Sequence, residues 1–153
     1  MGDCCCSPKD AAGSKPVTCR ACQTKGQPVD ELTIKALLTA HALRRFEPGS
    51  YRFCADASCD VAYFSESGTV FTKEDVRVPI WQKEPPERRT VCYCFDETES
   101  AIARELRDTG MSHAVDRVRA HIAAQRCACE VRNPRGVCCL GDVIAAVDRV
   151  QTR

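Results

Sequence analysis

The sequence predicts an α+β protein made of two small modules. Residues 17–82 hold most of the aromatic side chains and show strand-like runs. Residues 91–153 contain no Lys, are rich in Arg and Ala, and show helical spacing. Between them, residues 83–90 place two adjacent prolines among charged residues, a composition typical of a linker. Residues 1–16 offer little to bury and are expected to form a disordered, cysteine-containing tail.

In the first module we expect one helix and three short strands. Ile34, Leu37 and Leu38 recur at helical spacing within residues 31–44. A core of this size is small, so such a module usually needs a metal or another staple. The strand-like runs cover residues 51–53, 60–64 and 76–80.

In the second module we expect three helices around a modest core. Ile102 and Leu106 face inward on the first helix, and Gly110 is placed to end it. Ser112 can cap the second helix. The expected ranges are 97–108, about 113–122, and about 140–150.

Composition excludes several classes of protein. The net charge of +1 does not favour a strongly basic nucleic-acid binder, and we expect no nucleic-acid partner. No apolar run approaches the ~18 residues of a membrane span. The first residues lack the pattern of a secretory signal, which predicts a cytoplasmic protein with reduced thiols. The 13 cysteines are an odd number, so a complete set of intrachain disulfides would leave one thiol over.

The first cysteine set predicts a structural zinc site. Cys19 and Cys22 form a Cys-x-x-Cys knuckle, and Cys54 and Cys59 follow as Cys-x4-Cys. Four thiolates in two such pairs are a usual tetrahedral zinc set with no open coordination position. The alternatives are a redox dithiol at the first pair and a rubredoxin-like iron site.

The second cysteine set favours a [2Fe-2S] cluster. Cys-x-Cys spacing is tight for one zinc ion, whereas a [2Fe-2S] cluster takes two thiolates on each iron. Spacing alone does not choose four ligands from six, and a second zinc site or unrelated thiols are the alternatives. The six are Cys92, Cys94, Cys127, Cys129, Cys138 and Cys139.

A third feature is the run Cys4-Cys5-Cys6 in the tail. Thiolates bind soft ions such as Cu(I) or Hg(II), but three consecutive residues cannot easily all bind one ion. An incidental solvated run is the alternative. The sequence contains no Ser/His/Asp set, P-loop or dinucleotide-binding motif, so we do not expect an enzyme.

Taken together, these motifs resemble the N-terminal domain of CopZ-type copper chaperones. The resemblance covers about residues 17–145 and includes Tyr-Arg-Phe-Cys-x4-Cys-x-Val-Ala-Tyr-Phe, Val-Cys-Tyr-Cys-Phe and Cys-x3-Asn-Pro-x-Gly-x-Cys-Cys. It implies a zinc module followed by a [2Fe-2S] module similar to bacterioferritin-associated ferredoxin. The copper-binding domain that follows in that family, with its Met-x-Cys-x-x-Cys loop, is not in the sequence given. The implied zinc ligands are Cys19, Cys22, Cys54 and Cys59, and the implied cluster ligands are Cys92, Cys94, Cys129 and Cys139.

The resemblance leaves Cys127 and Cys138 as surplus thiols that could dock a soft metal, together with Cys4, Cys5 and Cys6. The expected function is a metallochaperone-like protein in copper handling, whose cluster passes one electron, for example from the cluster to Cu(II). Its partners would be the metal ion and a metal-transporting ATPase or a separate copper chaperone. The alternatives are a non-redox protein that sequesters or delivers Cu(I) or Hg(II), and a ferredoxin-like partner of another enzyme.

Overall fold

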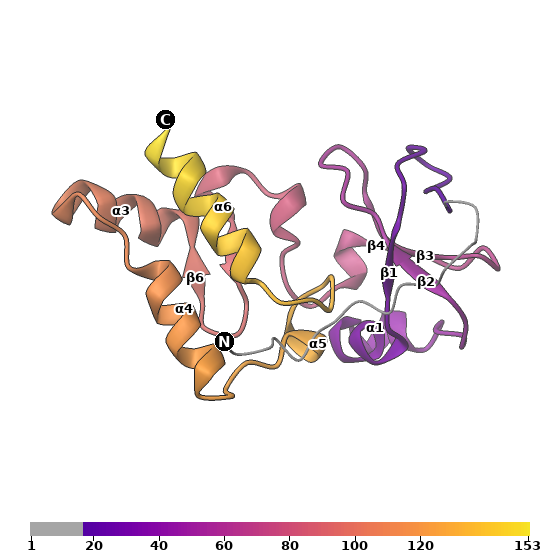
Figure 1. The fold of residues 1–153 in the computed structure, drawn as a ribbon. Coiled ribbons are helices and arrows are strands. Elements are labelled where there is room, and N and C mark those ends of the chain that lie inside the picture. Colours follow the sequence, from indigo (N-terminus) through magenta and orange to yellow (C-terminus); the bar gives the residue numbers. More distant parts are fainter. Residues whose placement is uncertain (1–16) are drawn as a thin grey trace.

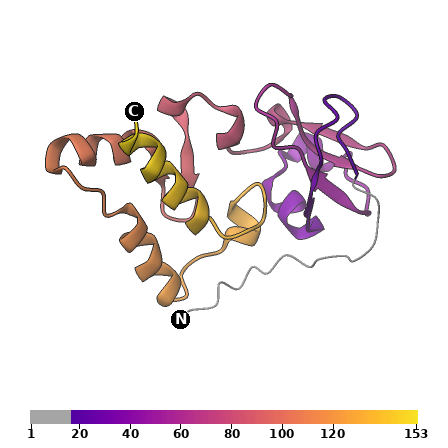
Figure 2. The same cartoon turned by 45° about the horizontal axis from the view of Figure 1, so that its top comes forward.

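The computed structural model describes residues 17–153 and shows an α+β fold with two lobes (Figure 1). One lobe holds a four-stranded sheet and helix α1, and the other holds helices α3, α4 and α6 (Figures 1 and 2). The expected tail, with Cys4, Cys5 and Cys6, lies outside the described residues. Within those residues, no helix is long and apolar enough to cross a membrane.

The sheet of the first lobe is antiparallel throughout, in the order β1-β2-β3-β4. Its inner side is rich in aromatic rings, with Phe53, Tyr63 and Phe71 fully buried against Ile34 of α1. This burial explains why short strands suffice, since aromatic side chains bury more area than any others. The elements are β1 (Gln27–Val29), α1 (Glu31–Leu37), α2 (Ala40–Leu43), β2 (Tyr51–Phe53), β3 (Val61–Ser65) and β4 (Val70–Thr72).

The third expected strand was placed wrongly. The strand that pairs with β3 is β4, which returns from a turn where Gly68 has a φ of 103°. Residues 76–80 form no strand; Val76 makes one isolated bridge to Leu38, and Ile80 is buried. Their alternating pattern therefore reflects burial of Val76 and Ile80 in the first core, and Pro79 has no N–H to donate to a sheet.

The expected helix over residues 31–44 is interrupted. α1 ends at Leu37, and the side chain of Thr39 accepts a hydrogen bond from the N–H of Ala42 to begin α2. In the gap, Leu38 is extended and bridges to Val76. The apolar residues keep a helix-like spacing in the sequence across this break, because Leu38 is buried in the same core as Ile34 and Leu37 of α1.

The second lobe has three longer helices close to the expected ranges, and further elements that the sequence analysis missed. Gly110 ends α3 with a φ of 76°. The missed elements are a one-turn helix and a short hairpin, both at cysteines, where hydrophobic periodicity has too few residues to be read. The elements are β5 (Thr90–Cys92), β6 (Glu97–Thr98), α3 (Glu99–Thr109), α4 (Ala114–Ala123), α5 (Cys129–Arg132) and α6 (Leu140–Gln151).

The residues expected to form a linker pack against the second lobe. They follow the short 3-10 helix η2 (Trp81–Lys83) and include a second one, η3 (Pro86–Arg88). Glu99 is buried on α3 and forms ion pairs with Arg89, from this segment, and with Arg149 of α6. Trp81 packs against the second core. The Cζ atom of the Arg149 guanidinium lies 5.2 Å from the centroid of the Trp81 ring.

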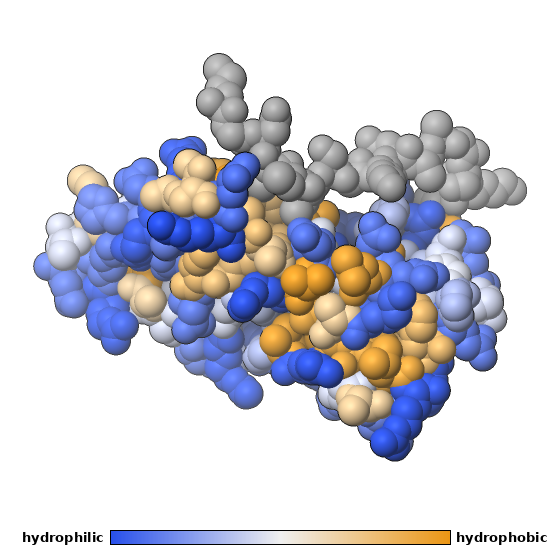
Figure 3. Space-filling model, turned by 90° about the horizontal axis from the view of Figure 1, so that it is seen from below, coloured by the Kyte–Doolittle hydropathy of each residue, from blue (hydrophilic) through white to orange (hydrophobic). Residues whose placement is uncertain are grey.

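The two lobes also meet directly. The buried Tyr63 hydroxyl of β3 donates a hydrogen bond of 2.6 Å to the carbonyl of Pro134, between α5 and α6. Gly136 approaches Thr33 of α1 so closely that a Cβ atom there would lie 2.6 Å from the Thr33 hydroxyl. The surface seen from below is hydrophobic in the region where α1 and α5 meet (Figure 3). These contacts join the segment between α5 and α6, next to Cys138 and Cys139, to β3 and α1 of the first lobe.

Candidate metal centres

The first cysteine quartet lies at one end of the sheet. Cys19 and Cys22 are on the turn before β1, Cys54 follows β2, and Cys59 precedes β3. The Sγ atoms of Cys19 and Cys59 are 3.9 Å apart, and those of Cys22 and Cys54 are 3.5 Å apart. All four Sγ atoms lie within 4.8 Å of one another, and among residues 17–153 this is the one such group of three or more potential metal ligands.

This spacing fits one tetrahedral ion. Zn–S bonds of about 2.3 Å at tetrahedral angles place neighbouring sulfurs about 3.8 Å apart. The two Sγ distances above bracket that value. All four cysteines are thiols rather than disulfides, as a metal site requires. The structure therefore brings together the four residues that the sequence predicts.

Backbone hydrogen bonds fix the turn that carries the first pair. The N–H of Gln23 donates to the carbonyl of Cys19 over 2.7 Å, and the N–H of Cys19 donates to the carbonyl of Thr24 over 2.8 Å. Gln23 has a φ of 64°, the left-handed conformation that closes the turn. This geometry lets two thiols three residues apart point to one place.

Lys83 holds the loop that carries the second pair. Its ammonium donates hydrogen bonds to the carbonyl of Asp56 over 2.7 Å and to the carbonyl of Cys59 over 2.8 Å. Its positive charge also favours the thiolate of Cys54 and so acts to lower the pKa of that residue. This role of Lys83 has no signal in the sequence, because a residue 24 positions from Cys59 forms no recognisable spacing with it.

The pKa values within the first quartet differ between the buried thiols, Cys54 and Cys59, and the half-buried Cys22. Burial raises the pKa of Cys54 to about 12 and also raises that of Cys59. The pKa of Cys22 falls to about 7, because the side chain and then the backbone N–H of Thr24 hydrogen-bond its thiolate. A metal bound by all four thiolates must therefore displace protons from the buried side of the site.

The second quartet has a different shape. The Sγ atoms of Cys92 and Cys139 are 2.9 Å apart, and those of Cys94 and Cys129 are 3.7 Å apart. Cys129 also faces Cys139. This contact lowers the pKa of Cys129 and raises the pKa of Cys139. The sulfurs thus form two pairs in a row rather than one compact group.

These pairs come from loops and short elements. Cys92 ends β5, Cys94 lies in the turn before β6, Cys129 begins α5, and Cys139 precedes α6. The N–H of Ala128 donates to the Cys94 sulfur over 3.3 Å. Strand β6, rather than a helix, follows Cys94, and Arg135 is paired with Asp142.

The six cysteines of this lobe differ in burial. Cys92, Cys129 and Cys139 are buried in the second core. Cys94, Cys127 and Cys138 are half-buried. The four in the row are those that the family resemblance implies.

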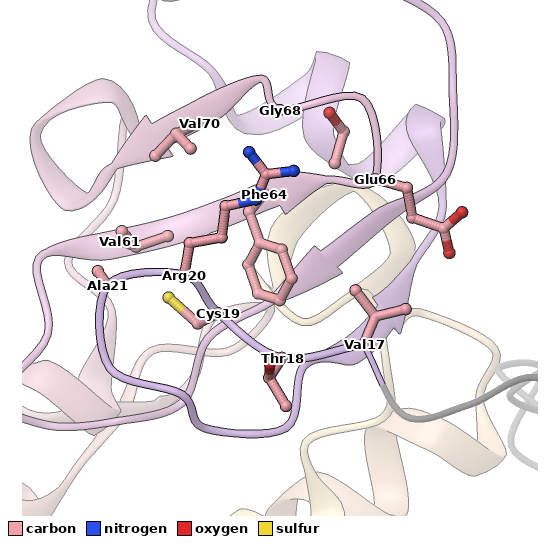
Figure 4. A pocket seen from close by; sticks show the side chains of 11 residues that line it. Val17, Thr18, Cys19, Arg20, Ala21, Val61, Phe64, Glu66, Gly68 and Val70 are labelled. Carbon is pink, nitrogen blue, oxygen red and sulfur yellow. The ribbon is translucent and has the colours of Figure 1, made fainter.

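A pocket of about 400 Å³ lies beside Cys19 of the first quartet (Figure 4). Phe64 and Val61 of β3 line it together with Val70 of β4, and the turn at Cys19 and Arg20 forms another wall. Its lining is mostly apolar, and Glu66 is the one carboxylate among the residues that line it.

The fold and the first quartet define a small α+β metal-binding protein with thiol ligands. Residues 16–77 match a family model named for CopZ and described as a zinc binding domain. The curated copper chaperone CopZ of Archaeoglobus fulgidus is 34% identical over 121 residues, which cover 79% of this chain and 57% of that protein. The chain thus spans little more than half the length of that relative.

The comparison with solved structures agrees. The X-ray structure of the A. fulgidus CopZ N-terminal domain superposes with a TM-score of 0.69 at 31% identity, covering 84% of this chain and 96% of that domain. The chain therefore belongs to the family of CopZ N-terminal domains.

Proposed function

We propose that this protein is a metallochaperone-like protein in copper handling, with zinc in the first quartet and a [2Fe-2S] cluster in the second. The observation that carries the proposal is the contrast between a compact sulfur group and a row of two sulfur pairs. The choice of copper as the metal handled comes from the similarity to a protein named copper chaperone CopZ.

The shape of the second quartet supports a cluster over a single ion. A [2Fe-2S] cluster needs two thiolates on each of two irons, and its own sulfides span the distance between the pairs. Cys92 with Cys139 would serve one iron, and Cys94 with Cys129 the other. A single zinc would instead need all four sulfurs around one point, as in the first quartet.

A bound cluster would supply one-electron chemistry, and the chain's own residues set its surroundings. Cys92, Cys129 and Cys139 are buried, which keeps water from most of the site. Cys94 is only half-buried and accepts a hydrogen bond from the backbone. The second quartet is therefore most accessible to solvent at Cys94, and this is the edge at which an electron would pass to an external acceptor.

Copper is the proposed acceptor. One electron reduces Cu(II) to Cu(I), the soft ion that thiolates prefer. The half-buried Cys127 and Cys138 lie two residues and one residue from proposed cluster ligands, and we propose that they help to dock the ion. The tail cysteines Cys4, Cys5 and Cys6 are a further proposed docking set.

The test adds stoichiometric Cu(II) to the reduced protein without oxygen and follows the EPR signal of the reduced centre. Loss of that signal with retention of Cu(I) supports the proposal. Unchanged signal with Cu(I) binding intact would instead favour a non-redox protein that sequesters copper. A Cys127→Ser, Cys138→Ser double variant should still be oxidised by Cu(II) but retain less Cu(I).

A further inference from the structure

The first quartet is open to solvent on one side. Cys19, Cys54 and Cys59 are 1%, 0% and 8% exposed, whereas Cys22 is only half-buried. A surface depression of about 440 Å³ reaches the site at this point, and Cys22 and Cys59 both line it. The depression is separate from the apolar pocket in Figure 4, which Cys22 does not line.

The two sides of the site are held differently, since the turn at Cys22 has its own backbone hydrogen bonds and one side-chain hydrogen bond, from Thr24 to Asp56 over 3.4 Å. Lys83 fixes the Cys54-to-Cys59 loop through two carbonyl groups, at Asp56 and Cys59. The turn at Cys22 consists of exposed or half-exposed residues, and its Gln23 side chain bonds only within the turn. Movement of Cys22 away from a metal would therefore disturb less structure than movement of the other three.

Carboxylates surround the opening. Asp56 and Asp60 line the depression, and the Asp60 side chain is 75% exposed beside Lys73. Negative charge at the rim repels anionic thiolates, so the incoming group is a neutral thiol that loses its proton at the metal. The opening is also large enough for a thiol to reach the site.

The geometry points to Cys22 as the exchange position of the first quartet, where the sulfur of an incoming thiol, from a partner protein or a small molecule, replaces the Cys22 sulfur as a metal ligand and so begins transfer of the metal. This inference rests on the proposed zinc site. In the step, a metal–sulfur bond to the incoming thiol forms and the metal–sulfur bond to Cys22 breaks. The proton released by the incoming thiol passes to the Cys22 thiolate, and no oxidation or reduction occurs.

The test first measures zinc per chain in the purified protein, since absence of zinc would defeat the proposed site itself. The zinc protein is then treated with N-ethylmaleimide, and each cysteine is followed by peptide mapping. Cys22 should be modified at least about tenfold faster than the other three ligands, because thiol reactivity follows access. Equal rates, or earlier labelling of Cys19, Cys54 or Cys59, would overturn the inference.

A second measurement follows zinc transfer to dithiothreitol by native mass spectrometry. Attack at Cys22 predicts a rate that rises in proportion to the dithiothreitol concentration. Ser58→Trp should slow the transfer, because exposed Ser58 lines the depression and its hydrogen bond to Asp56 uses only the backbone N–H. Arg44→Trp, at an exposed position that does not line the depression, is the matched control. A rate independent of dithiothreitol concentration, equal in all three proteins, would show that zinc leaves by itself.

Discussion

The two cysteine quartets use the same number of thiols to build different sites. In the first, paired loops from a sheet bring four sulfurs within 4.8 Å of one another. In the second, two close pairs lie in a row between a hairpin and two helix starts. The comparison teaches that the spatial grouping of the sulfurs, rather than the number of cysteines, indicates the metal centre.

Replacing one proposed ligand cysteine of either quartet should have the largest effect, because it should remove one metal centre and leave the other. Cys54→Ser should abolish zinc binding and leave iron and sulfide in place, whereas Cys139→Ser should abolish the cluster and leave zinc, because each site needs all four thiolates. The measurement is zinc, iron and sulfide per chain.

Adjacent cysteines supply the controls for these variants. Cys138→Ser and Cys127→Ser should retain iron, although each lies within two positions of a proposed ligand. Loss of iron from Cys138→Ser with retention in Cys139→Ser would reverse the assignment of the second quartet.

Proton release should show how the first site is built. Burial raises the pKa of both Cys54 and Cys59, so both are protonated near neutral pH until zinc displaces their protons. Zinc binding should therefore release at least these two protons. Its affinity should fall by about 100-fold for each unit by which the pH is lowered from 7.5.

Calorimetry of zinc binding at pH 7.5, in buffers with different ionisation enthalpies, counts the protons released. A count below two protons per zinc would contradict the buried thiols described above. The pH dependence itself is measured by competition with a chelator of known affinity.

Removing Lys83 should weaken the first site without removing a ligand. Lys83→Met deletes two charge-assisted hydrogen bonds to the Cys54-to-Cys59 loop, worth about 2 kcal/mol together, or about 30-fold in zinc affinity. Lys73→Met is the control, because Lys73 forms only an exposed ion pair with Asp60 at 3.4 Å. Competition with a zinc chelator measures both, and equal affinities would show that Lys83 does not hold the loop.

A smaller effect is expected at Arg117 in the second lobe. Its guanidinium bonds the buried Glu97 over 2.7 Å and Glu105 over 2.9 Å. Because the Arg117 side chain is 42% exposed, Arg117→Met should lower the free energy of unfolding at pH 7 by only about 1 kcal/mol.

The pH dependence of this ion pair has a definite sign. The hydrogen bond from Arg117 holds the pKa of Glu105 down at about 2. The stabilisation is therefore present above about pH 4.5, the ordinary range of a Glu, and is lost as the pH falls toward 2. Denaturant unfolding at pH 7 and at pH 4 should show a smaller difference between the two proteins at the lower pH; an unchanged difference would contradict this account.

The sequence predicted the parts of the molecule that have a local signal. Ile102 and Gly110 marked α3, and the pairs at Cys19 and Cys54 marked the first site. It misplaced a strand onto Val76 and Ile80, because burial in a loop can imitate strand alternation. It also missed α5, which is shorter than the repeat that would reveal it.

The remaining features depend on contacts between distant segments. Lys83 reaches the Cys54-to-Cys59 loop, and Tyr63 reaches Pro134 across 71 positions. No spacing rule predicts such contacts, since they exist only after the two lobes have packed. For the same reason spacing left open which four of the six cysteines would hold a cluster, and the choice of Cys92, Cys94, Cys129 and Cys139 came from the family resemblance.

The metal content of the intact protein tests the difference between the two quartets most directly. The protein should be purified without oxygen, and zinc, iron and acid-labile sulfide measured per chain alongside the visible and EPR spectra. We predict about one zinc, two irons and two sulfides, with the spectra of a [2Fe-2S] centre. Two zinc ions with no sulfide would contradict the account, because the second quartet would then be a single-ion site like the first.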